Sequence, residues 1–73
     1  MPDQLLELLS VAGSRLYALL TRLTLNADVA EELMQELFLK LSRSSAFRHA
    51  KDPVAYACRS AIHLAFDARK KMS

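Results

Sequence analysis

The sequence predicts an all-α protein, a compact bundle of three to four helices. Apolar residues recur every three or four positions through most of the chain, alternating strand patterns are absent, and the 73 residues include one glycine and two prolines. Hydrophobic residues make up 52% of the chain, as expected for a single domain spanning residues 1–73. Because a chain this short buries only about 60% of its unfolded surface, we expect a partner to cover part of the rest.

The first predicted helix begins near the N-terminus and ends near Leu25-Asn26. Pro2 and Asp3 are both favoured in a first helical turn, and asparagine tolerates the left-handed conformation that commonly closes a helix. Ser10 and Gly13 are weak helix formers, so the segment is either one kinked helix or two helices. The apolar stripe consists of Leu5, Leu8, Leu9, Ala12, Leu16, Leu19, Leu20 and Leu23.

The second predicted helix begins at Asp28 and runs to about Ser44 or Ser45. Asp28 followed by Glu31 forms a capping-box pattern, in which each side chain accepts an unpaired amide hydrogen at the helix start. The apolar stripe is Val29, Leu33, Leu37, Phe38 and Leu41, and outside it lie Glu31, Glu32, Gln35 and Glu36. Charged outer faces are ordinary on surface helices, so the residues alone favour a solvated face over a docking face.

Residues 45–52 lose the helical period and are predicted to form a loop. This loop carries one aromatic residue, Phe47, and three side chains that can be cationic: Arg48, His49 and Lys51. Asp52 as the cap and Pro53 at the first helical position, where its missing amide hydrogen costs nothing, then start the last helix.

The last predicted helix has two distinct faces, with Phe66 near their border. Small residues that allow close packing form the inner face: Val54, Ala57, Cys58, Ala61, Leu64, Ala65 and Ala68. Tyr56, Arg59, His63 and Lys70 stand at offsets of three, four and seven residues, so they share a different side.

The predicted loop and last helix place aromatic rings beside cations: Phe47 beside Arg48 and His49, and Tyr56 near Arg59. This combination suits single-stranded or partly melted DNA, because bases stack on rings and phosphates bind cations. The alternative for Phe47, that its ring fills the small core, is left open. Arg69, Lys70 and Lys71 also complement the negative end of the helix dipole, so this run is weak evidence for DNA by itself.

Charge is divided unevenly between the two halves of the chain. Residues 1–37 carry six acidic and two basic residues, net −4, and residues 38–73 carry eight basic and two acidic residues, net +6; together they give the chain's +2. The division suggests two partners: a basic surface for the first half and an anionic one, nucleic acid first, for the second.

The sequence indicates neither an enzyme nor a metal, cofactor or membrane protein. Cys58 is the single cysteine and fits a small apolar residue in a reducing compartment; a helix turns His63, five residues on, about 140° away from it. His49, His63 and Asp67 form the one imaginable metal set, and nothing in the sequence requires a metal. No apolar run reaches the roughly 20 residues that span a bilayer, so we expect a cytoplasmic protein.

Residues 28–41, DVAEELMQELFLKL, closely resemble a signature of the second conserved region of extracytoplasmic-function sigma factors, D-x-A-E-[DE]-L-x-Q-[ED]-x-F-x-x-[LAV]. Residues 53–67 resemble the helix of that family that begins near an aromatic residue and ends in a basic run. With the Leu-Tyr-x-Leu-x-x-x-Leu pattern of residues 16–23, the resemblance covers nearly the whole chain.

The resemblance implies a helical domain that binds two partners. Its middle helix would dock on the clamp coiled coil of the largest subunit of core RNA polymerase through Asp28, Glu31, Glu32, Gln35 and Glu36. The following segment and last helix would recognise the minus-ten promoter element and hold a base extruded from the non-template strand. The residues expected there are Phe47, Arg48, His49, Lys51, Tyr56, Arg59, His63, Lys70 and Lys71. A regulating anti-sigma factor is a further expected partner.

The sequence departs from the family pattern at three places. Tyr56 stands where the family usually has Trp and keeps a stacking ring, and His63 replaces a usual Asn, which could make its contacts pH-sensitive. The family's second domain, a helix-turn-helix, is not among the 73 residues, so we expect an excised domain or a reduced member.

Two other interpretations compete with this one. The first is a helical protein-interaction module without a DNA role. The second is a standalone helix-turn-helix repressor, which residues 45–52 disfavour because the usual turn between paired helices has only about 3 to 4 residues.

Overall fold

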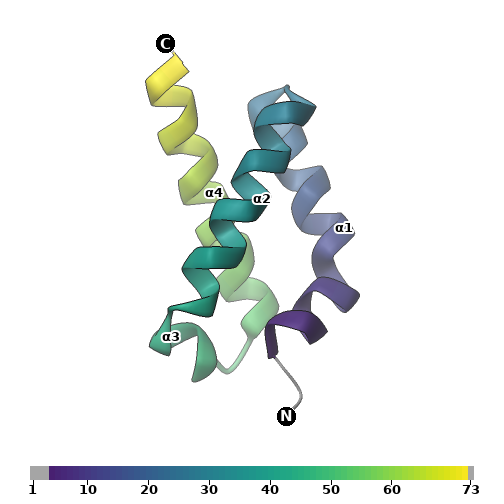
Figure 1. Ribbon diagram of the computed structural model, residues 1–73, viewed down its shortest axis with the longest axis vertical. Helices are drawn as coiled ribbons and strands as arrows, with labels where there is room; N and C mark the ends of the chain where they lie inside the picture. The colour runs from purple at the N-terminus through teal and green to yellow at the C-terminus, as the bar shows by residue number, and fades with distance from the viewer. Residues whose placement is uncertain (1–3, 73) are drawn as a thin grey trace.

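The computed structural model describes residues 4–72. Within this range the chain forms four helices joined by short connections, and no strand. Figure 1 shows three long helices side by side, with a short one at the end of the bundle where the chain begins. They are α1 (Gln4–Thr24), α2 (Ala27–Ser42), α3 (Ser45–Arg48) and α4 (Pro53–Met72). The predicted all-α bundle is confirmed.

The three long helices enclose one hydrophobic core. α1 packs against α2 and α4, α2 packs against α4, and α3 contacts α4. α1 and α2 supply mostly leucines, whereas α4 supplies alanines that allow its backbone to approach the others. The buried core residues are Leu5, Leu8, Ala12, Leu16, Leu20, Ala30, Leu33, Leu37, Leu41, Phe47, Ala57, Ala61 and Ala65.

α1 is one continuous helix, which settles the question that Ser10 and Gly13 left open. Its predicted stripe faces the core, with Leu19 and Leu23 half-buried against it and Leu9 half-buried beside it. A Cβ at Gly13 would meet only Leu9 of the same helix within 4 Å, so packing does not demand glycine there. Pro2 and Asp3, predicted to lie in the first turn, fall outside the described residues.

The prediction for the connection between α1 and α2 is wrong in two details. Leu25, not Asn26, takes the left-handed conformation, with φ 57°. Asn26 is instead the N-cap of α2: its side-chain Oδ1 accepts the amide hydrogens of Asp28 at 2.9 Å and Val29 at 3.2 Å. Asparagine is among the best N-caps, and because it occupies that place Asp28 lies in the first turn.

The predicted loop at residues 45–52 is also partly wrong, because α2 ends at Ser42 and α3 forms immediately afterwards. Ser44 caps α3, its hydroxyl accepting the amide hydrogen of Phe47 at 3.0 Å. A single turn has too few internal hydrogen bonds to be stable alone. The burial of Phe47 in the shared core supplies the tertiary contact that holds this turn.

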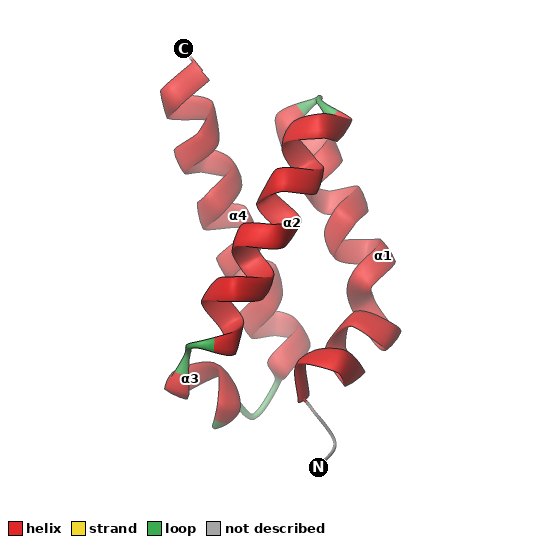
Figure 2. Ribbon diagram, in the orientation of Figure 1, coloured by secondary structure: helices red, strands yellow, loops and turns green. Residues whose placement is uncertain are grey.

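The start of α4 agrees with the prediction. Asp52 Oδ1 accepts the amide hydrogen of Ala55 at 3.1 Å, and Pro53 is the first helical residue. Figure 2 shows how short the connections between the helices are. No helix among the described residues is long and apolar enough to cross a membrane.

Candidate functional site

The outer face of α2 carries all five residues predicted to bind a protein partner. Each is exposed: Asp28, Glu31, Glu32, Gln35 and Glu36. They lie on the side of α2 away from the core, because a helix with 3.6 residues per turn points side chains at these positions away from the direction of Leu33, Leu37 and Leu41. Lys40 is the one exposed cation of α2 within its bounds, so the face is strongly acidic.

Leu39 lies in the middle of this acidic face, and sequence reasoning missed it. Its side chain is 55% exposed. It follows Glu32, Gln35 and Glu36 by seven, four and three residues, so all four share one side of α2. The helical spacing could have revealed this leucine, which lies outside the apolar stripe of the helix.

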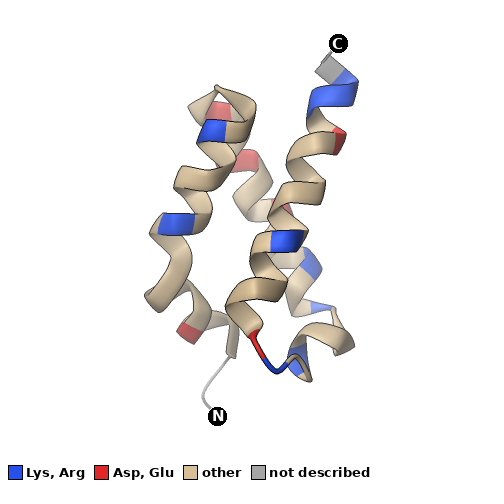
Figure 3. Ribbon diagram, turned by 180° about the vertical axis from the view of Figure 1, so that it is seen from behind, with Lys and Arg blue, Asp and Glu red and all other residues tan. Residues whose placement is uncertain are grey.

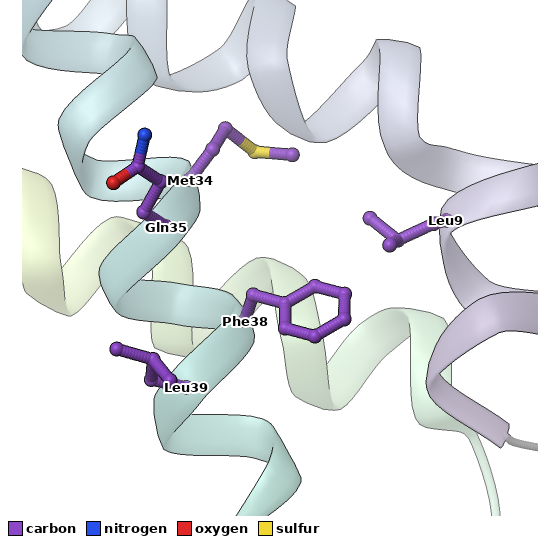
Figure 4. A pocket seen from close by; sticks show the side chains of 5 residues that line it. All are labelled: Leu9, Met34, Gln35, Phe38 and Leu39. Carbon is purple, nitrogen blue, oxygen red and sulfur yellow. The ribbon is translucent and has the colours of Figure 1, made fainter.

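A mostly apolar groove lies between α1 and α2 beside the acidic face. Its lining consists of Leu9, Met34, Gln35, Phe38 and Leu39. Figure 4 shows Met34 and Phe38 pointing from α2 toward Leu9 of α1, while Gln35 and Leu39 project from the outer side of α2. Gln35 and Leu39 thus belong both to the groove and to the acidic face.

The basic residues lie on other elements than the acidic face. Those predicted to contact DNA are exposed on α3, the following loop, and the outer side and C-terminal end of α4: Arg48, His49, Lys51, Arg59, His63, Lys70 and Lys71. Figure 3, viewed from behind, shows blue segments along α4 and the loop before it, with most of α2 behind them. The structure therefore presents the two opposite charges on different helices.

Phe47 belongs to the core and not to an exposed base-stacking site. Its side chain is 2% exposed, and its ring centroid lies 6.0 Å from that of Tyr56, the planes tilted by 52°. The fully buried apolar side chains of α4 are alanines, and the ring from α3 joins the core that they face. Of the two alternatives left open for Phe47, the structure shows the core position.

Tyr56 and His49 are also tied to neighbouring groups. Tyr56 is half-buried against the core, and its hydroxyl lies 3.3 Å from the hydroxyl of Ser44, the α3 cap. His49 Nδ1 lies 2.9 Å from the carbonyl oxygen of Ser45, although the side chain is exposed. Both residues therefore contribute to the local structure around α3.

Phe66 is the aromatic side chain of α4 that solvent reaches best, being 48% exposed. Phe66 lies on the exposed side of the border expected between the two faces of α4. It follows Arg59 by seven residues and His63 by three, and precedes Lys70 by four. Phe66 thus lies on the same outer side as these three residues.

The described residues contain no group of three His, Cys, Asp or Glu side chains placed to hold a metal ion. Cys58 is a free, half-buried thiol. The charged faces and the groove are the surface features on which the predicted binding residues lie.

A helical bundle with an acidic helix face and a separate basic helix is a domain built to bind two partners. Residues 9–73 match the family described as Sigma-70 region 2. The chain belongs to this family, and region 2 is the part of a sigma factor that binds core RNA polymerase and recognises the minus-ten promoter element. Comparisons with curated proteins and with solved structures found no match.

Proposed function

We propose that α2 docks on the clamp coiled coil of the polymerase's largest subunit and that α4, with the segment before it, contacts the non-template promoter strand. The observation that supports this division is the separation of the charges: four exposed acids on α2, and a row of exposed basic residues on α3, α4 and the loop between them. A single partner of one charge could not satisfy both surfaces, whereas a basic protein surface and DNA satisfy one each.

The docking face combines charge with apolar area. Asp28, Glu31, Glu32 and Glu36 supply the charge, and Leu39 with the adjoining groove supplies apolar surface that the bundle itself does not cover. Acidic rims steer a basic partner toward the site, and apolar area is what a bound partner removes from water. We propose that both contribute to polymerase binding.

The DNA face consists of Arg48, Lys51, Arg59, His63, Lys70 and Lys71, with the exposed edges of His49 and Tyr56 beside them. Cations that bind phosphates position the strand without reading its sequence. Phe47 is outside this set because its ring is buried; its part is to hold α3 against α4. Base stacking on this face therefore falls to rings other than Phe47.

Charge reversal on each face tests the division. Glu32→Lys should abolish capture of the chain by core RNA polymerase, and Arg59→Glu should leave capture intact while preventing promoter DNA binding. The matched controls are Glu7→Lys and Arg22→Glu, which make the same changes at exposed positions of α1 and should change neither. Loss of polymerase binding by both Glu32→Lys and Arg59→Glu would favour the alternative, a protein-interaction module without a DNA role.

We further propose that the chain represents the extracytoplasmic-function subgroup, working with the polymerase in the cytoplasm under the control of an anti-sigma factor. The DVAEELMQELFLKL string of residues 28–41 supports this. Fusing the chain to a subgroup member's second domain should restore transcription from that member's promoter in a strain lacking the member. Failure of a fusion that still binds polymerase would count against the subgroup.

A further inference from the structure

We propose that Phe66 is a stacking platform for an unpaired DNA base, a role that rests on the DNA face proposed above and adds a residue to it. The sequence places three aromatic residues in the basic half after α2: Phe47, Tyr56 and Phe66. Phe47 is buried and Tyr56 is half-buried against it, whereas Phe66 is 48% exposed. A ring must be open to solvent before a base can stack on it, and Phe66 meets that condition best of the three.

A single exposed apolar side chain needs no explanation by itself, because such side chains are common on soluble proteins. What distinguishes Phe66 is its neighbourhood. The residues three and four positions away, which lie closest on a helix surface, are Ile62, His63, Arg69 and Lys70. Tyr17 of α1 is similarly exposed at 39%, but its corresponding neighbours are Gly13, Ser14, Leu20 and Thr21, none of them charged.

Phe66 also lies within a row of cationic side chains along α4. Arg59 is two turns before it and Lys70 about one turn after it, so at 1.5 Å of rise per residue the two lie roughly 10 and 6 Å from it along the helix axis. Asp67 is the one acid of α4, against Arg59, Arg69, Lys70 and Lys71. A strand that lies along this row can place a base on the ring and its flanking phosphates against cations on either side.

Base stacking can be distinguished from simple apolar contact by substitution: another aromatic side chain at residue 66 should preserve it, and an aliphatic side chain should not. The chain has no tryptophan, so Phe66→Trp introduces a single tryptophan at the site, whose fluorescence can be excited without that of the tyrosines. Because residue 66 is on the surface, its substitution should leave the fold intact, which circular dichroism verifies. The matched control is Tyr17→Trp, a single tryptophan of similar exposure away from the basic residues.

The experiment titrates each full-length variant with single-stranded oligothymidylate at low salt, beside a duplex of equal length. Phe66→Trp fluorescence should be quenched by the single strand and much less by the duplex, whose bases are already stacked, while Tyr17→Trp fluorescence should not change. Phe66→Ala and Phe66→Leu should each weaken single-strand binding about tenfold or more, and Phe66→Tyr should restore it.

Two results would overturn the proposal in different ways. If Phe66→Ala and Phe66→Leu bind the single strand like the unsubstituted chain while Arg59→Glu does not, the DNA face stands and Phe66 has no part in it. If the unsubstituted chain shows no binding, or if Arg59→Glu binds equally well, the proposed DNA face itself fails and the role of Phe66 with it.

Discussion

At the scale of single residues, two side chains cap the helices whose starts the sequence pattern did not place correctly. Asn26 caps α2 through its side-chain oxygen, and Ser44 caps α3 in the same manner. Both follow the general rule that short polar side chains satisfy the unpaired amides of a first helical turn. The sequence pattern favoured Asp28 as the first cap, and the structure places Asn26, two residues earlier, in that role.

Asn26→Ala should lower the free energy of unfolding by about 1 kcal/mol, because two amide hydrogens of α2 lose their acceptor. Asn26→Asp should retain most of the stability, since aspartate caps equally well. Chemical denaturation followed by circular dichroism measures both. If Asp28→Ala proved to be the more destabilising substitution, the cap would belong to Asp28.

Phe47→Ala should destabilise the chain by about 3 to 5 kcal/mol, because the ring is buried in the core that holds α3 against α4. Phe47→Leu should cost less, since it keeps most of the buried volume. Thermal and chemical unfolding measure the difference. A stable Phe47→Ala variant with impaired DNA binding would show instead that the ring serves the DNA and not the core.

At the scale of elements, α2 shows how one helix serves both the fold and a partner. Leu33, Leu37 and Leu41 face the core, while the opposite side carries the acids with Leu39 among them. The groove between α1 and α2 continues that outer side onto a second helix through Leu9. The polymerase contact is therefore expected to have a salt-dependent and a salt-independent component.

Leu39→Gln should weaken polymerase binding at every salt concentration while leaving the salt dependence as it is in the unsubstituted chain, because it removes apolar area and no charge. Glu32→Gln should instead make binding less dependent on salt. Val11→Gln, at an exposed position of α1, is the control and should have no effect. Surface plasmon resonance across a salt series separates these results, and a Leu39→Gln variant with full affinity would exclude the apolar contact.

At the scale of the whole molecule, the bundle keeps its two charged surfaces apart. Its dimensions are about 40 × 20 × 17 Å, so the acidic and basic surfaces of so small a domain stay separate only because they occupy different helices. A basic protein and a polyanion that bind as proposed would not compete for the same side chains. The acidic surface repels a polyanion and the basic surface repels a basic protein, so each partner is kept off the wrong face.

DNA binding by the whole chain should fall steeply with salt concentration, because the cations of α4 and the preceding loop displace counterions from the phosphates. Lys51→Gln should reduce the slope of the log–log plot of affinity against salt by about one. Lys40→Gln, an exposed substitution on α2, should leave it unchanged. Fluorescence anisotropy over a salt series provides both slopes, and equal slopes for Lys51→Gln and the unsubstituted chain would exclude a Lys51 phosphate contact.

The sequence by itself determined the helical class, the core stripes of α1 and α2, the Asp52-Pro53 start of α4 and its alanine face, because these depend on periodicity and capping that neighbouring residues carry. The acidic and basic halves were also visible there, since charge is a property of composition. The roles of individual residues on those surfaces stay proposals that the experiments above test.

Only the tertiary structure decided which aromatic rings are inside. Phe47 lies in a segment without helical period, so nothing local shows whether its ring meets solvent or core; the contact of α3 with α4 places it inside. Phe66 lies in a regular helix near the border of its two faces, where the pattern does not fix exposure, and the packing of α4 leaves its ring 48% exposed. Burial is a property of packing between distant segments, and a linear pattern determines it only where one helix face is consistently apolar.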